Sequence, residues 1–319
     1  MAENKGIYFT ELRLQNVRCF GDEAVLKLSN DKGEWSRWNV ILGDNGTGKT
    51  TLLQCLAGME LIEDDFFSSP IGKADTKQKQ YFPSIVINYK DIDYRRITGV
   101  SNNTTISSNL INLYTNQESK ITLLQRYDFE GINRGHFSTD FLLDNDGELG
   151  LLILGYGANR RISFQVLTEK ELASKNSETL FNDDAKLINA EDWLYQMDYS
   201  AAYAENRNTE LKEDAKKRRD LVFEIVKSIL PDIEKITIEV EGSPPTPTIK
   251  FKTPYGLVGI HQLSFGYKTM VAWIVDVAAR MFTQYPNSEN PLEEPVIIIV
   301  DEIDLHLHPK WQRQIFVFL

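Results

Sequence analysis

The sequence predicts an α/β fold, in which a mixed sheet is joined by an antiparallel β subdomain and a helical insert. The first observation is a short apolar run at residues 38–42 that leads into a glycine-rich loop at residues 43–50. The second is the helical spacing of leucines that follows at residues 51–59. The third is an all-apolar run at residues 296–300, which is typical of a strand buried in a parallel sheet, and two acidic residues follow it. Together the three observations predict a fold of the P-loop NTPase type.

The other elements follow from the period of the apolar residues and from the positions of Gly and Pro. Strands are expected at residues 7–14, 24–28, 38–42, 84–89, 149–154, 235–240, 248–251, 257–260 and 296–300. Helices are expected at residues 51–59, 190–203, 210–230 and 269–282. Polar composition predicts an exposed insertion at residues 63–82 and a loop at residues 101–108, which are rich in Ser, Thr and Asn.

Each kind of element has its own sequence signal. The first two strands alternate apolar and polar residues, and Pro and Gly turns separate the three short strands between residues 235 and 260. In the first helix Leu52, Leu53 and Leu56 share one face. The two middle helices are short and lack sustained heptads, which excludes a long coiled-coil arm.

Composition narrows the classes of protein. The 319 residues carry a formal net charge of −11, which argues against a surface built for nucleic acid, because that affinity rests on Lys and Arg. No apolar run reaches the roughly 20 residues of a membrane span, and residues 1–10 lack the apolar core of a secretion signal. Cys19 and Cys55 have no metal-type spacing, so we expect reduced thiols in the cytoplasm.

The glycine-rich loop reads Gly-Asp-Asn-Gly-Thr-Gly-Lys-Thr at residues 43–50. Glycines let the backbone curl so that N–H groups point at phosphate oxygens, and the next helix offers the positive end of its dipole. Lys49 is expected to reach the β- and γ-phosphates, Thr50 to ligate Mg²⁺ and Thr51 to touch the α-phosphate. The strand and helix expected on either side favour this interpretation over a chance glycine-rich turn.

Asp301 and Glu302 follow the apolar run at residues 296–300. A carboxylate at the end of a buried strand lies beside the phosphate loop in P-loop folds, so Asp301 is expected in the Mg²⁺ shell. Glu302 is expected to polarise the attacking water. The alternative is a strand that ends at a solvated acidic turn, and the phosphate loop upstream makes this alternative the weaker one.

The string Leu-Ser-Phe-Gly at residues 263–266 is weakly specific by itself, because an ordinary turn before a helix could look the same. Its position before a helix and the acidic strand end makes the chain resemble the ABC-type ATPases of the SMC, RecF and OLD group. Other strings carry the same resemblance: residues 12–20, the Asn45-Gly46 pair, Tyr-Gly-Ala-Asn-Arg at residues 156–160, and residues 301–309.

The resemblance implies a fold of the ABC type and head-to-tail dimers that sandwich two ATP molecules. Ser264 and Gly266 of one subunit would meet the γ-phosphate that Lys49 of the other subunit holds. Arg18 matches a family arginine near the nucleotide phosphates. Glu302, Lys49 and Ser264 are then the catalytic residues, and Thr50 and Asp301 hold the metal. The expected nucleotide-binding residues are Arg18, Asn45, Gly46, Thr47, Gly48, Lys49, Thr50, Thr51, Ser264 and Gly266.

The elements are expected to form one discontinuous ATPase domain. Its segments are an N-terminal lobe with the phosphate loop at residues 1–62, a variable insertion at 63–148, a middle strand with a helical lid at 149–234, and a signature lobe at 235–319. The histidine that ends a later strand in the family is not reached before Leu319. We therefore expect a truncated chain or, if this length is natural, slow hydrolysis.

Compact members of the group are common in bacterial anti-phage systems. The chain is similar to the Septu PtuA-like ATPases, including their retron-associated form, and also to the PARIS ATPase. A Septu-like ATPase implies an HNH-type nuclease as partner, and a retron adds a reverse transcriptase and its RNA–DNA product. The leading hypothesis is thus a dimeric ATPase that regulates an effector nuclease in defence. A slowly hydrolysing ATP-loaded scaffold and a RecF-like DNA-repair ATPase remain as alternatives.

Overall fold

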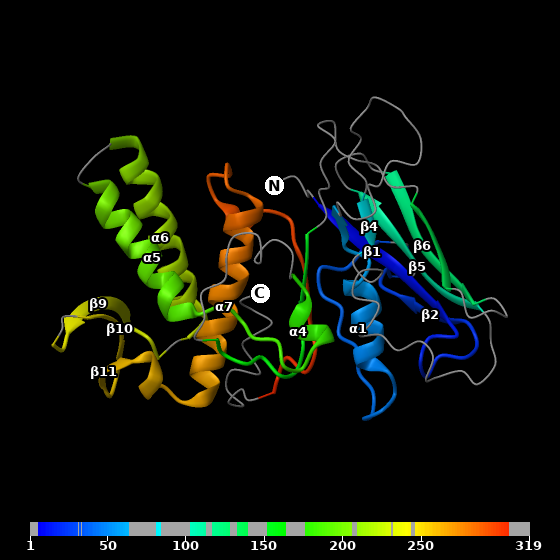
Figure 1. Cartoon of the computed structure of the whole chain (residues 1–319), viewed down its shortest axis with the longest axis horizontal. Helices are drawn as coiled ribbons and strands as arrows, with labels where there is room; N and C mark the ends of the chain where they lie inside the picture. Colours follow the sequence, from blue (N-terminus) through cyan, green and yellow to red (C-terminus); the bar gives the residue numbers. More distant parts are fainter. Residues whose placement is uncertain are drawn as a thin grey trace. The chain divides into compact units, whose positions relative to one another are not determined.

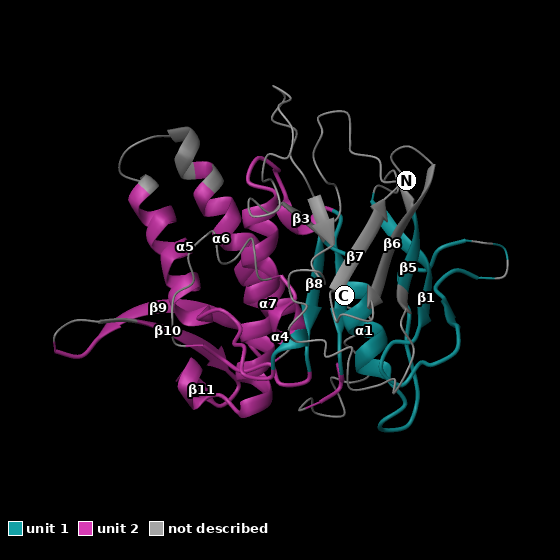
Figure 2. Cartoon of the chain, turned by 45° about the vertical axis from the view of Figure 1, so that its right-hand side comes forward, with its two compact units in different colours: residues 1–157, 180–182, 295–301 teal, residues 158–179, 183–294, 302–319 magenta. Residues whose placement is uncertain are grey.

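The computed structural model describes residues 6–30, 32, 34–63, 81–83, 103–112, 117–127, 133–139, 152–163, 176–205, 209–230, 232–243 and 246–305. The chain forms two compact units, which are coloured separately in Figure 2 and are described here one at a time. Unit 1 comprises Met1–Gly157, Leu180–Asn182 and Pro295–Asp301; unit 2 comprises Ala158–Thr179, Asp183–Glu294 and Glu302–Leu319. No helix among the described residues is long and apolar enough to cross a membrane.

An antiparallel sheet of five strands, in the order β2-β1-β5-β6-β7, forms much of unit 1 (Figure 1). Its strands are β1 Ile7–Gln15, β2 Ala24–Lys27, β5 Asn103–Asn112, β6 Gln117–Tyr127 and β7 Asn133–Thr139. The register of β1 against β5 shifts between Phe9 and Glu11. This irregularity adds one residue to β1, so that Leu12 and Leu14 face the same core as Phe9.

The prediction of a loop at residues 101–108 is wrong. Strand β5 occupies Asn103–Asn112 and pairs with β1 on one edge and with β6 on the other. Ile106 and Leu110 are fully buried, and Ser108 is buried with them. The ladders on both edges pair the backbone groups of this strand, although its composition is polar. The partners that stabilise this strand are distant in sequence, so local composition did not reveal it.

The second part of unit 1 is a parallel pair of strands with a helix. β12, Ile297–Val300, pairs in parallel with β8, Ile153–Tyr156, which confirms the parallel strand expected before the acidic residues. Helix α1, Lys49–Ala57, follows the glycine-rich loop as expected. All four residues of β8 are buried, whereas in β12 only Ile299 is.

The strand expected at residues 38–42 is not formed, and this prediction is wrong. The structure assigns no strand there, and the side chains of Val40 and Leu42 are 61% and 87% exposed. Among the described residues β12 pairs with β8, and no ladder includes residues 38–42. An apolar run reports a tendency to be buried, but a strand also requires a neighbour that pairs with it.

Two further predicted segments lie wholly or largely outside the residues that the structure describes. The strand expected at residues 84–89 lies outside them. The insertion expected at residues 63–82 lies largely outside them as well, although its two ends form a short hairpin. In this hairpin β3, Leu61–Glu63, pairs antiparallel with β4, Tyr81–Pro83.

Unit 2 combines helices with a three-stranded antiparallel sheet of order β11-β10-β9, so the expected helices and hairpins are confirmed. Its helices are α5 Ala190–Glu205, α6 Thr209–Ile229 and α7 Phe265–Gln284, with short 3-10 turns at Ile260–Gln262 and Pro291–Glu293. Its strands are β9 Lys235–Glu241, β10 Thr246–Thr253 and β11 Gly256–Gly259. A one-turn helix, α4 Glu178–Phe181, lies where the chain passes between the units.

Helix α7 is largely buried and holds an internal ion pair. Arg280 Nε lies 2.7 Å from Asp276 Oδ2, and Asp276 also accepts a hydrogen bond of 3.0 Å from the backbone N–H of Ile188. Both side chains are buried, so each charge depends on these partners. The pair therefore fixes α7 against the segment before α5.

The assignment of β5 as a core strand can be tested by removing a buried side chain. Ile106→Ala should lower the free energy of unfolding by about 2–5 kcal/mol, because it leaves a cavity where Ile106 packs with Leu14 and Leu110. Val25→Ala on the exposed face of β2 is the control and should change stability by less than about 0.5 kcal/mol. Chemical denaturation of the three proteins would measure both effects, and equal stabilities would contradict the assignment.

Candidate functional site

The glycine-rich loop closes tightly onto α1. Gly48, the N-cap of α1, has φ +93°, a left-handed conformation that favours glycine. A Cβ atom there would also lie 2.4 Å from Cys19 Sγ and 2.9 Å from the Phe20 ring. No side chain caps the N-terminus of α1. The first N–H groups of this helix therefore have no side-chain competitor for an anion.

Lys49 is held within the loop by backbone oxygens. Its Nζ donates hydrogen bonds of 2.6 Å to the carbonyl of Gly43 and 2.8 Å to that of Asp44. Thr47 Oγ1 donates to the same Asp44 carbonyl at 2.8 Å. Asn45 and Gly46 form the exposed tip of this turn. The Lys49 ammonium thus places a positive charge beside the backbone of the glycine-rich loop, where phosphates are expected to bind.

The phosphate loop also reaches the acidic strand end. Thr50 Oγ1 donates a hydrogen bond of 2.6 Å to Asp301 Oδ2, although the two residues are 251 positions apart. Asp301 is only 7% exposed, and its backbone N–H donates to the Tyr156 carbonyl at 2.8 Å. A hydroxyl and a carboxylate side by side are oxygen ligands of the kind that Mg²⁺ prefers. The donor set therefore fits a magnesium ion bound with phosphates.

Arg18 lies beside α1. Its backbone has φ +45°, and its Nη1 donates to Gln54 Oε1 at 2.7 Å and to Thr51 Oγ1 at 3.4 Å. Gln54 in turn donates to the Leu180 carbonyl at 2.8 Å. The side chain is thus fixed on the helix that carries Thr50 and Thr51, two of the predicted nucleotide-binding residues.

In unit 2, the signature string forms the start of α7. The helix begins at Phe265, four residues before the expected start, and Ser264 is its N-cap. The Ser264 hydroxyl makes no capping hydrogen bond, whereas its carbonyl accepts from the Lys268 N–H at 3.0 Å. Ser264 is exposed and Phe265 is 58% exposed, while Gly266 lies in the first turn.

Glu302 opens a turn in unit 2 with an unusual backbone. It is exposed and has φ +46°. Its carbonyl accepts two hydrogen bonds of 3.0 Å, one from the Leu305 N–H and one from Arg160 Nη2. The backbone of Glu302 is therefore held while its carboxylate remains in solvent.

The predicted site residues fall into two groups, one in each unit. In unit 1 the phosphate loop, Arg18 and Asp301 surround the N-terminal half of α1. Ser264, Gly266 and Glu302 belong to unit 2.

Three residues near these groups were not predicted to act there: Cys19, Gln54 and Arg160. The contact of Cys19 with Gly48 follows from the tight turn at residues 16–21, which is closed by the hydrogen bonds between Val17 and Phe20. Gln54 could have been found from helical spacing, because it lies one turn after Thr50 and Thr51. Arg160 gave no local signal for its contact with Glu302.

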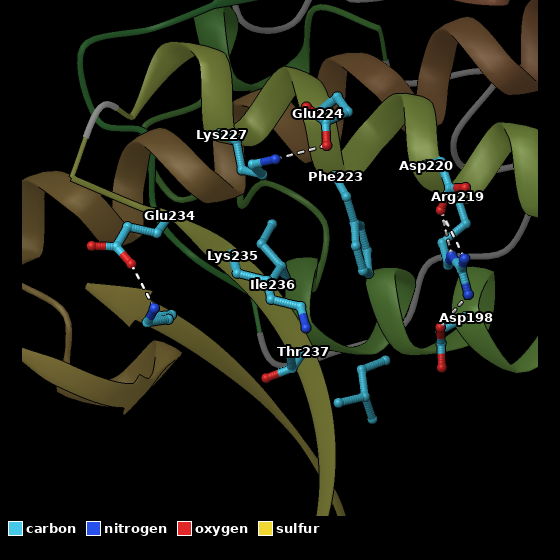
Figure 3. Close-up of a pocket in the computed structure, with 12 residues that line it drawn as sticks. Asp198, Arg219, Asp220, Phe223, Glu224, Lys227, Glu234, Lys235, Ile236 and Thr237 are labelled. Atoms are coloured by element: carbon cyan, nitrogen blue, oxygen red, sulfur yellow. Dashed lines mark hydrogen bonds and ion pairs between the residues drawn. The ribbon is translucent and has the colours of Figure 1, made fainter. Parts of the chain in front are cut away.

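A separate groove of about 790 Å³ lies in unit 2 between helices α5 and α6 and strands β9 and β10 (Figure 3). None of the predicted nucleotide-binding residues lines it. Its cations are largely neutralised by acids of the same lining: Arg219 by Asp198, Lys227 by Glu224, and Lys252 by Glu234. These internal pairs leave little net charge in the groove to attract an anionic ligand.

The glycine-rich loop, the helix behind it and the acidic residue at a parallel strand end define a P-loop ATPase domain of mixed α/β content. The chain belongs to the family described as "AAA domain, putative AbiEii toxin, Type IV TA system", which matches residues 38–319.

Three curated relatives match nearly the whole chain. One from Vibrio cholerae serotype O1 biovar El Tor, named "Retron Vc95 probable ATPase", is 24% identical over 96% of this chain and 67% of its own length. The "Retron Ec83 probable ATPase" of Escherichia coli is 26% identical over 96% and 64%. The "Septu protein PtuA" of Bacillus mycoides (strain KBAB4) is 25% identical over 95% and 35%. The chain thus spans about two thirds of the first two relatives and about a third of the third.

The two thiols provide a test of the loop and helix geometry. Cys19 is exposed, whereas burial raises the pKa of the Cys55 thiol to about 12. At pH 10 only about one Cys55 thiol in a hundred would be ionised, so it should not react with a chromogenic disulfide reagent. We expect one reactive thiol per native chain from pH 7 to 10 and two after denaturation. A Cys19→Ser variant should show none in the native state, and two rapid thiols in the native protein would contradict this geometry.

Proposed function

We propose that the chain binds and hydrolyses ATP and that it does so as a head-to-tail dimer. The observation that carries the proposal is the Thr50–Asp301 hydrogen bond beside an uncapped helix N-terminus and a glycine-rich loop. Together these groups offer amides and an ammonium to phosphates and two oxygens to a cation. These groups of unit 1 therefore support the binding of nucleotide phosphates together with a magnesium ion.

Each part of this site has a distinct role in the proposal. The amides at the start of α1 and Lys49 bind the phosphates, and Arg18 and Thr51 border them. Mg²⁺, held by Thr50 and Asp301, would neutralise phosphate charge as it develops in the transition state. Glu302 accepts a proton from the attacking water, and its exposed carboxylate is accessible for this.

The dimer is proposed because the signature string of this chain is exposed at a helix N-terminus. Ser264 has a hydroxyl that is not used as a cap, and the adjacent Phe265 leaves more than half of its surface exposed. A second copy would cover Phe265 and would bring its γ-phosphate to the Ser264 hydroxyl and the amides of α7. Ser264 and Gly266 thereby complete the site of the other subunit.

The relatives suggest the setting in which this ATPase acts. They carry the names of retron and Septu proteins, so we propose that ATP binding and hydrolysis control a partner effector in anti-phage defence. An effector nuclease is the proposed partner, of the HNH type if the system is Septu-like. In a retron system the reverse transcriptase and its RNA–DNA product would join the assembly.

Replacing the proposed general base separates binding from hydrolysis. Glu302→Gln removes the proton acceptor but keeps the size of the side chain, so kcat should fall by about 100-fold or more while the Kd for ATP stays within about 2-fold. Glu293→Gln, an exposed glutamate in the same unit, is the control and should retain full turnover. Phosphate release and nucleotide binding measure the two effects.

The outcome also distinguishes the proposal from its main alternative. If Glu302→Gln hydrolyses ATP at the rate of the unaltered chain, Glu302 has no role as a base. If the unaltered chain binds ATP but shows no turnover even in a single-turnover measurement, a scaffold that holds ATP explains the site better than an ATPase.

A substitution at the signature tests the shared site. Ser264→Arg places a long cation where the second subunit should dock, and should abolish the ATP-dependent dimer while leaving ATP binding by the monomer unchanged. Sedimentation velocity with ATP, in chains that also carry Glu302→Gln, would measure the dimer fraction. Ser243→Arg at the exposed β9–β10 turn is the matched control. Equal dimer fractions in the two variants would refute the head-to-tail arrangement.

A further inference from the structure

Arg160 is a charged residue in a loop, yet its side chain is buried. It follows β8 by four residues and is only 6% exposed. Charged side chains are rarely buried to this extent unless partners compensate the loss of water. Two partners of Arg160 in unit 2 are Glu302, whose carbonyl accepts from Nη2 at 3.0 Å, and Trp273, whose ring centroid lies 6.0 Å from Cζ.

The hydrogen bond from Arg160 reaches a residue with a strained backbone. Glu302 has φ +46°, which residues with a Cβ adopt only where their surroundings hold them. Its carbonyl accepts from two donors: Arg160 Nη2, which precedes Glu302 in the sequence, and the Leu305 N–H, which follows it. The turn that starts at Glu302 is therefore fixed partly by a side chain that lies 142 positions away.

We infer that Arg160 is the positioning residue of the catalytic carboxylate: its guanidinium fixes the left-handed turn at Glu302 and thereby aims the Glu302 side chain. The inference rests on the proposed function, in which Glu302 is the base. A general base must lie within hydrogen-bond reach of its water, and a displacement of about 1 Å can cost about 100-fold in rate. Loss of the Arg160 donor should therefore reduce hydrolysis without removing any group that contacts ATP.

The contact with Trp273 gives Arg160 a second partner. Trp273 is a buried residue of α7, the helix whose N-cap is Ser264. Stacking of the guanidinium over an aromatic ring keeps the side chain extended toward Glu302 and offsets part of the cost of burying its charge. Arg160 is thus attached to the signature helix at one side and to the Glu302 turn at the other.

Kinetics of two Arg160 variants test the inference. Arg160→Met keeps the apolar stem against Trp273 but has no donor, so kcat should fall by about 10- to 100-fold with the Kd for ATP unchanged within about 2-fold. Arg160→Lys restores one cationic donor and should recover part of the loss. Arg161→Ala is the control, since Arg161 is exposed and forms an ion pair with Asp184, and it should keep normal turnover.

A double substitution separates positioning from a general structural role. In chains that already carry Glu302→Gln, Arg160→Met should lower the residual kcat by less than about 2-fold, because the side chain that Arg160 aims is no longer a base. A residue that only supports the fold would lower turnover by the same factor in both backgrounds. Equal factors, or normal turnover of the Arg160→Met chain, would overturn the inference.

Hydrogen exchange of the Leu305 amide provides a readout that needs no ATPase activity. This amide donates to the Glu302 carbonyl, so Arg160→Met should speed its exchange by about 10-fold or more, whereas Arg161→Ala should not. Unchanged exchange would overturn the inference even if turnover fell. Absence of ATP hydrolysis by the unaltered chain would instead sink the proposed function, and the exchange result would still decide whether Arg160 holds the turn.

Discussion

The parallel pairing of β8 with β12 is the constraint on which the candidate site depends. It aligns Ile153 with Ile297 and Tyr156 with Val300, and the Tyr156 carbonyl then accepts the Asp301 N–H just beyond the strand. The backbone of Asp301 is fixed by this last bond, and its carboxylate reaches Thr50. The same pairing makes both chain segments leave the strands together, which is why Arg160 and Glu302 come within hydrogen-bond distance.

A second constraint is the close approach of the turn at residues 16–21 to the phosphate loop. Cys19 and Phe20 occupy the space where a side chain at Gly48 would lie, and Arg18 of the same turn binds Gln54 on α1. The left-handed backbone at Arg18 and at Asn16 allows the turn to fold back in this way. Glycine at position 48 is therefore required twice, by its own φ and by its neighbours.

The sequence was most informative where structure depends on neighbouring residues. The phosphate loop with α1, the helices of unit 2 and the acidic end of β12 all have local signals, and each was predicted. β5 was missed and the strand at residues 38–42 was wrongly expected, because pairing with distant segments decides both. The start of α7 was expected four residues late, because Ser264, Phe265 and Gly266 were interpreted as a signature string that leads into the helix, whereas Ser264 is its N-cap. The role of Arg160 depends on a partner far along the chain, which no local pattern encodes.

The arrangement of unit 2 gives a physical route from the signature string to the proposed base. Ser264 is the N-cap of α7, and a continuous helix connects it to Trp273, so a change in the position of the N-cap moves the ring as part of one rigid element. The ring contacts Arg160, which in turn holds the Glu302 carbonyl. Contact with a second subunit at Ser264 would thereby bear on the orientation of Glu302 through packed groups alone.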